Sequence, residues 1–224
     1  RFIAAYQNGA TPNPCIDCNR FMKFEKLLVR ARQLDRDYIV TGHYARIAYD
    51  AGTGRYLLKK AVDKTKDQSY VLYAMTQEQL AHTLFPLGGF HKTEIREIAA
   101  IQGFINADKP DSQDICFVRD GDYARFIERY TGKPCESGDF LDRHGNVLGR
   151  HNGLWRYTVG QRKGLGLSLA KPMYVRSKNI AENTVTLCEN DGLFSNSLDA
   201  TDFNWIAYDK IDAPIRVKAK IRYR

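Results

Sequence analysis

The sequence lacks long apolar runs, a secretory leader and a paired cysteine framework. No hydrophobic stretch approaches the roughly 18 residues that a membrane-spanning helix needs, which argues against a membrane span. No basic and apolar leader opens the chain, and because it starts at Arg1 rather than Met we expect a missing N-terminal part. The five cysteines are odd in number and irregularly spaced, unlike a secreted disulfide scaffold. We therefore expect a cytoplasmic protein.

Internal repeats and low-complexity segments are also absent. The composition, 43% hydrophobic and 27% charged, is that of an ordinary globular protein, and 224 residues allow two or three small domains. A formal net charge of +8 favours polyanionic partners, but it does not separate nucleic-acid binding from a merely soluble surface.

The first half has an alternating α/β pattern. Apolar residues recur at helical spacing from Phe21 to Leu34, after a Pro-Asn-Pro turn, and predict a helix that begins near Asn19. A capping box at Thr76 and a start at Thr93 predict two further helices. β-rich runs between turn residues predict a strand and a hairpin, at residues 38–40, 44–49 and 55–62.

The second half changes character near residue 118. A short helix is expected from Asp122 to Tyr130, closed by Gly132, and β-like runs follow at residues 173–176, 184–188 and 214–224. In the last run apolar residues alternate with five cations, so that one face of the expected strand is fully basic. A polyanion would relieve the repulsion along this row, and a solvated edge strand that blocks aggregation is the alternative.

Cys15 and Cys18 form a Cys-x-x-Cys pair within TPNPCIDCNR. The pair fits half of a zinc site, a redox dithiol, or a nucleophile beside a bystander thiol. No second cysteine pair or matching histidine pair completes a zinc site, so we expect no structural metal. Cys18 directly precedes the expected helix, where the helix dipole and the nearby Arg20 and Lys23 favour a thiolate.

The remaining cysteines give weaker signals. Cys116 lies in DSQDICFV, where the neighbouring acids Asp111 and Asp114 discourage thiolate formation, so that taken alone it resembles a buried cysteine. Cys135 and Cys188 have the pattern of structural residues.

Three polar motifs have both a functional and a structural interpretation. KTKDQSYVLYAM could bind phosphate or a base, or it could cap a helix. YTVGQRKGLGLS is a basic glycine loop without the spacing of a nucleotide-binding P-loop. His43 follows an expected strand at the usual ligand edge of an α/β sheet, where structural histidines are equally common.

Six strings in this order resemble the tRNA-specific 2-thiouridylases of the MnmA type. They span nearly the whole chain and read TPNPCIDCNRFMKF, TGHYA, KDQSYVLY, LFPLGG, KPDSQDICF and YTVGQRKGLG. The resemblance implies the C-terminal part of a PP-loop ATP-pyrophosphatase domain, of the adenine nucleotide α-hydrolase type, over 1–117. A small central domain over 118–180 and a partial β-barrel over 181–224 would follow. The family's SGGxDS phosphate loop is not in this sequence, so this piece should not hydrolyse ATP and should be inactive by itself.

The resemblance also implies a chemistry. ATP, with Mg²⁺, would adenylate O2 of the wobble uridine of tRNA, and a persulfide on Cys116 would deliver sulfur to C2 while Cys18 acts as the nucleophile. The two cysteines would form an alternate disulfide during turnover. A protein that carries a persulfide would supply the sulfur, and neither DNA nor a membrane is an expected partner.

Contact residues follow from the same motifs. Gly42 matches an ATP contact and His43 a tRNA contact. Positions that match contacts to the target base or to other parts of tRNA are Asn13, Pro14, Cys15, Lys66, Asp67, Gln68, Arg222 and Tyr223.

The sequence departs from many relatives at Cys15, where they carry an aspartate regarded as a possible acid/base group. A thiol does that work less readily at neutral pH, so either the role is dispensable or Cys15 competes with Cys18 for the disulfide. A non-catalytic RNA-binding module, and a redox or zinc protein built on Cys15 and Cys18, are the alternatives to the enzyme.

Overall fold

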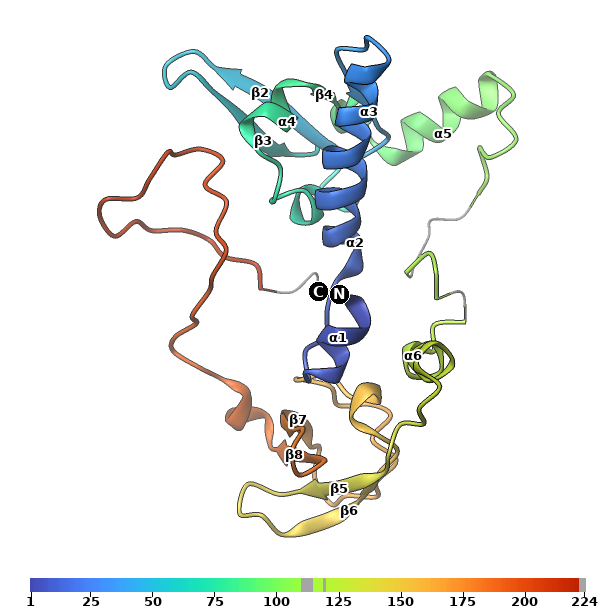
Figure 1. Cartoon of the computed structure of the whole chain (residues 1–224), viewed down its shortest axis with the longest axis vertical. Helices are drawn as coiled ribbons and strands as arrows, with labels where there is room; N and C mark the ends of the chain where they lie inside the picture. Colours follow the sequence, from blue (N-terminus) through green and yellow to red (C-terminus); the bar gives the residue numbers. More distant parts are fainter. Residues whose placement is uncertain (110–114, 119, 222–224) are drawn as a thin grey trace. The chain divides into compact units, whose positions relative to one another are not determined.

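The computed structural model describes residues 1–109, 115–118 and 120–221, and its backbone divides into two compact units (Figure 1). The first unit joins residues 1–14 to residues 112–199, and the second joins 15–111 to 200–224. Each unit has its own apolar core. Among the described residues no helix is long and apolar enough to cross a membrane.

The second unit is built around a hairpin and a short parallel strand pair. Strands β2 (Ala45–Asp50) and β3 (Arg55–Lys60) pair in antiparallel register, as the hairpin prediction required. Strands β1 (Ile39–Val40) and β4 (Thr83–Leu84) pair in parallel. The apolar core of this unit is formed by Phe24, Ala45, Leu72, Met75, Leu80 and Phe85.

The first helix of the second unit is longer and wound differently from the prediction. It begins at Pro14, not near Asn19, as α2 (Pro14–Asp17), continues as the π-helix η1 (Cys18–Lys26) and ends as α3 (Leu27–Gln33). Proline suits the first helical position because it needs no N–H partner there and its φ is already helical. Pro14, which was expected to lie in the turn before the helix, is therefore the residue that starts it.

The other helices of the second unit follow local signals. The capping box between Thr76 and Gln79 opens α4 (Gln77–Ala81), as predicted. Helix α5 (Lys92–Ile101) is capped by His91 together with Glu94, so it begins one residue before the expected Thr93. Short 3₁₀ turns lie at η2 (Ser69–Val71) and η3 (Pro86–Gly89).

Residues 200–209 are fastened to the second unit by polar contacts. Arg55 and Gln77 both donate to the Ile206 carbonyl at 2.9 Å, and Asn204 Nδ2 donates to the carbonyls of Tyr73 and Met75 at 2.7 and 2.8 Å. A segment that follows the first unit in the chain therefore belongs structurally to the second.

The first unit contains α1 (Phe2–Gln7), α6 (Tyr123–Thr131) and one four-stranded sheet. The sheet order is β6-β5-β8-β7, with a parallel β5–β8 pair between antiparallel neighbours. Short 3₁₀ turns precede and follow its β7–β8 hairpin, at η4 (Leu154–Arg156) and η5 (Asn190–Leu193). The strands are β5 (Gly138–Leu141), β6 (Val147–His151), β7 (Tyr174–Asn179) and β8 (Thr184–Cys188).

The strand predicted over residues 214–224 is wrong for its described part, because residues 214–221 form no strand. Alternation alone does not make a strand, since the backbone also needs a hydrogen-bonded neighbour, and no described strand pairs with this segment.

The expected division at residue 180 falls in the turn between β7 and β8, whose pairing joins residues on both sides of it. No sheet of the described residues closes into a barrel.

Candidate functional site

Cys15 and Cys18 lie in the first turns of the long helix, and both are exposed and in no disulfide. Because the helix starts at Pro14, Cys15 occupies its first turn and Cys18 is the fifth helical residue. The expectation that Cys18 directly precedes the helix is wrong. The unpaired N–H groups of a helix start lie within its first four residues, so the stabilisation argued for Cys18 applies to Cys15 instead.

The two cations expected to support the Cys18 thiolate have other partners. Arg20 donates to both carboxylate oxygens of Asp202, at 2.6 and 3.5 Å, and this hydrogen bond raises the pKa of the guanidinium. Lys23 Nζ lies 3.4 Å from Nε2 of His43. In a π-helix hydrogen bonds join residues five apart, which is the spacing of Cys18 and Lys23, so these two lie on adjacent turns.

Asn19 fixes the helix at the level of Cys18. Its side chain is 4% exposed, and its Nδ2 donates to the Val71 carbonyl at 3.4 Å. Phe24, one turn further along, is fully buried in the core of the second unit. Both buried residues follow Cys18 in the helix and hold the backbone that carries the exposed thiol.

His43 is a buried neutral histidine with a defined tautomer. Its ring centroid lies 5.8 Å from that of Phe24 and 5.7 Å from that of Phe85, and burial, with the Lys23 charge, lowers its pKa to about 4. Lys23 has only protons to donate, so Nε2 must accept. Nδ1 then carries the proton and donates to Thr41 Oγ1 at 2.6 Å.

Gly42 follows β1 at the carboxyl edge of the β1–β4 pair and is exposed. A Cβ built there would approach only the Leu87 side chain, at 3.4 Å. The backbone is therefore uncovered on that side, and the ATP contact expected at Gly42 stays a prediction.

The KDQ motif is largely engaged in holding the fold. Asp67 accepts from the Ala61 N–H at 3.0 Å and from the Ser69 hydroxyl at 2.7 Å. Gln68 exchanges two bonds with the Tyr44 backbone, one through its side chain and one through its own N–H, both at 2.8 Å. Lys66 is half-buried. The Gln68 side chain thus joins this loop to the residue that precedes β2, and the Asp67 side chain joins it to the residue that follows β3.

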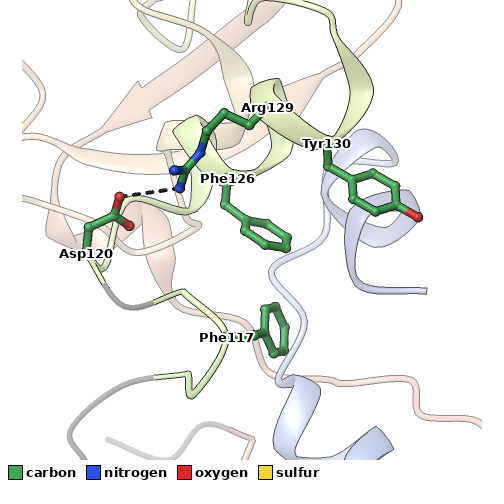
Figure 2. Close-up of a pocket in the computed structure, with 5 residues that line it drawn as sticks. All are labelled: Phe117, Asp120, Phe126, Arg129 and Tyr130. Atoms are coloured by element: carbon green, nitrogen blue, oxygen red, sulfur yellow. Dashed lines mark ion pairs between the residues drawn. The ribbon is translucent and has the colours of Figure 1, made fainter.

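Cys116 is a free, exposed thiol in the first unit, next to an aromatic cluster. Phe117 lies 5.2 Å from Phe2 and 5.4 Å from Phe126, measured between ring centroids. Figure 2 shows Phe117 and Phe126 facing a pocket of about 490 Å³, which Tyr130 and the ion-paired Asp120 and Arg129 also line. Phe117, which follows the thiol, contacts these rings but is itself 45% exposed, so Cys116 lies at the open edge of this aromatic base.

Several expected site residues lie outside the described residues: Asp111, Asp114, Arg222 and Tyr223. Cys18 belongs to the second unit and Cys116 to the first, as do Asn13 and Pro14. None of the five cysteines is in a disulfide, and burial raises the pKa of Cys135 and of Cys188. Within the part of the chain that the structure describes, no three His, Cys, Asp or Glu residues gather as metal ligands.

Two family models match the chain in the order of its halves. The model described as tRNA methyl transferase HUP domain matches residues 1–120, and the tRNA methyl transferase PRC-barrel domain matches residues 124–189. Proteins named tRNA-specific 2-thiouridylase MnmA are 52% identical in Clostridioides difficile and 55% identical in Acetivibrio thermocellus, over 222 residues in each case. This chain belongs to the MnmA family.

The match to MnmA proteins covers nearly all of this chain but only part of theirs. It includes 99% of this chain and 62% of the relatives from Clostridioides difficile and Acetivibrio thermocellus. For the relative from Geotalea uraniireducens, 54% identical, it includes 59% of that protein. The chain therefore spans about three fifths of the length of these MnmA relatives.

The aromatic base of Cys116 and the Arg20–Asp202 pair were both missed from the sequence of this MnmA-family chain. The first left a signal, since Phe117, Tyr123 and Phe126 recur close to the cysteine. The second left none, because its partners are 182 positions apart.

Proposed function

We propose that this chain is the larger part of an enzyme that forms 2-thiouridine at the wobble position of tRNA. The observation that carries the proposal is identity of about half of the residues, along almost the whole chain, with proteins named tRNA-specific 2-thiouridylase. Two free and exposed thiols, Cys18 and Cys116, fall in the strings that resemble the family's reactive cysteines. The net charge of +8 suits a polyanionic substrate in the cytoplasm.

The proposed chemistry divides one substitution into two steps. ATP, bound with Mg²⁺ partly against Gly42, transfers AMP to O2 of the uridine and pyrophosphate leaves. The outer sulfur of a Cys116 persulfide, charged by a sulfur-carrier protein, attacks C2 and AMP departs. The Cys18 thiolate then attacks Sγ of Cys116, which forms the Cys18–Cys116 disulfide and releases 2-thiouridine; a cellular thiol reductant restores both cysteines.

The side chains around the helix start divide this work. In the proposal Asn13, Pro14 and Cys15 contact the target base, and His43 contributes a neutral surface rather than a cation to the tRNA contact, because its pKa is about 4. Lys66 contributes a positive charge to the tRNA contact, whereas Asp67 and Gln68 mainly hold the conformation of the loop that carries Lys66. Arg222 and Tyr223 add further tRNA contacts.

Cysteine variants of the whole protein test the proposal by thiolation of a tRNA transcript. We expect Cys18→Ser and Cys116→Ser each to abolish product, because each removes a sulfur that must form and break a bond. Cys15→Ser, a matched change three residues from Cys18, should retain part of the activity. Full activity of Cys18→Ser would reject its assignment as the nucleophile.

A further inference from the structure

The basic glycine loop of the first unit, Thr158–Gly166, is a rigid structure fixed to the sheet. Gly160 N–H donates to the Val175 carbonyl at 2.7 Å, and Val175 N–H donates to the Gln161 carbonyl at 3.0 Å. Leu165, near the other end, is buried in the core of the first unit. Both ends of the loop are thus held in place, and its middle residues, 162–164, are exposed.

The side chain of Gln161 braces the loop from inside. Its Oε1 accepts from the Thr158 N–H at 2.9 Å, and its Nε2 donates to the Lys163 carbonyl at 3.0 Å. With that carbonyl turned inward, the backbone N–H groups of Arg162, Lys163 and Gly164 have no hydrogen-bond partner among the described residues.

These N–H groups lie in a backbone turn of the kind that binds anions. Gly164 has φ of +74°, and the residue before it has a negative φ. Successive backbone N–H groups without partners, in a turn at a glycine of positive φ, are the donors from which a concave anion-binding nest is built. The side chains of Arg162 and Lys163 are exposed, and neither forms an ion pair within the described part of the chain.

A pocket of about 440 Å³ adjoins this loop, and Thr158 and Gln161 form part of its wall. Its volume lies in the usual range of small-molecule sites. The aromatic side chains in its lining are Tyr6, Tyr123 and Trp155, of which the two tyrosine rings are stacked with centroids 6.3 Å apart.

The pocket and the loop differ in charge, because acidic side chains line the pocket whereas the loop is basic. Asp120 and Asp122 line the pocket and are ion-paired, with Arg129 at 3.5 Å and with Arg156 at 3.6 Å, but each carboxylate has further lone pairs that can accept hydrogen bonds from the N–H groups of a base. Arg156, the cation of the lining, is already paired with Asp122 at 3.6 Å and Glu128 at 3.8 Å. A ligand with a flat N–H-bearing ring and an anionic group therefore fits with the ring in the pocket and the anion on the loop.

We propose that the pocket and the 162–164 loop together bind one unpaired nucleotide of the RNA substrate. The base stacks against the aromatic lining, and its phosphate is held by the nest and by the two cations. This inference rests on the proposed function only for the identity of the RNA. It assigns an RNA contact to the first unit, in addition to the contact positions that the motif resemblance supplies.

Charge reversal on the loop tests the site without touching the core. Binding of a fluorescent 17-nucleotide anticodon stem-loop is measured against salt, for the wild type, Lys163→Glu and Lys133→Glu. Lys133 is an exposed cation of the same unit outside the pocket lining, so its variant has the same change in net charge. We expect Lys163→Glu to weaken binding about tenfold and to reduce the slope of log K against log salt by about 1, whereas Lys133→Glu keeps the wild-type slope.

The other possible results would refute the site, its RNA ligand or the proposed function. Equal slopes for the two variants, or no RNA binding by the wild type, would refute the site. If Lys163→Glu loses binding of AMP but keeps that of the stem-loop, the pocket serves a free nucleotide and the RNA assignment is wrong. If the wild type binds RNA through Lys163 while the whole protein never thiolates tRNA, the site stands and the proposed function fails.

Discussion

At the scale of single residues, His43 shows how burial fixes a charge state. The ring packs between two phenylalanines and faces the Lys23 ammonium, so that protonation is opposed from both directions. Its pKa is lowered from 6.5 to about 4. The imidazole is therefore an acceptor for Lys23 throughout the physiological pH range.

This shift predicts a dependence of stability on pH. Below pH 6.5 the unfolded chain binds a proton at His43 that the folded chain refuses until about pH 4, so acidification favours unfolding across that window. The contribution lost is on the order of 3 kcal/mol. We expect urea denaturation of His43→Gln to show a flatter decline between pH 6.5 and 4 than the wild type.

The control for this prediction is His144→Gln, which removes an exposed loop histidine. It should keep the wild-type decline, because the environment of His43 is unchanged. Parallel curves for the wild type and His43→Gln would contradict the argued burial of the ring.

The residue scale also shows what a sequence can reveal about a site. Cys15, Cys18 and Cys116 stand out because the strings around them are specific, and the structure shows that all three are exposed and in no disulfide. The partner of Arg20 is not recognisable, because Asp202 reaches it only after the chain has folded back onto the second unit. Short sequence strings identify candidate reactive residues, whereas the ion-pair partner of a charged residue depends on contacts between distant positions.

At the scale of elements, local signals predicted helices better than strands. Helix α6 was predicted almost to the residue, because Asp122 caps its start and Gly132, with φ of +66°, ends it. Strands β5 and β6 were missed, since they are short and β5 depends on a parallel partner more than 40 residues away. The predicted strand over 214–221 failed for the converse reason, because it has the alternation without a partner.

Turn η3 gives a sharp test of close packing. A Cβ on Gly88 would lie 1.7 Å from the Ala45 carbonyl oxygen, which is backbone and cannot move aside, whereas a Cβ on Gly89 meets nothing within 4 Å. We expect Gly88→Ala to lower the free energy of unfolding by about 3 kcal/mol or more. Chemical denaturation followed by circular dichroism measures it.

Gly89→Ala is the matched control, one position along the same turn. Its change should stay within about 0.5 kcal/mol. Equal losses in the two variants would show that the turn as a whole, rather than the approach of Gly88 to β2, limits substitution.

At the scale of the whole molecule, the chain has two cores rather than one. The first core contains Leu187, on strand β8 of the four-stranded sheet, and the second contains Leu72, beside the hairpin. Both residues are at most 1% exposed. Sequence patterns gave the change of character near residue 118. They did not show that residues 1–14 belong with the later half and residues 200–221 with the earlier one, since no local pattern encodes that exchange.

Separate cores predict separable unfolding. We expect two thermal transitions by calorimetry, with Leu187→Ala lowering one and Leu72→Ala lowering the other. Each substitution removes the same atoms from a buried site and should cost about 2–5 kcal/mol. A single transition, shifted equally by both variants, would show that the units unfold as one.

The π winding of η1 has a consequence for how this chain can change length. A π turn holds one residue more than an α turn, so the stretch between Cys18 and Phe24 has room for a deletion. Losing one residue there would let the helix continue as a regular α-helix with Phe24 and Leu28 still buried. The sulfur of Cys18 would keep nearly its present direction relative to Phe24, because six residues of π-helix and five of α-helix turn the chain by almost the same angle. A one-residue gap at this place in an alignment would therefore leave both the fold and the direction of the thiol unchanged.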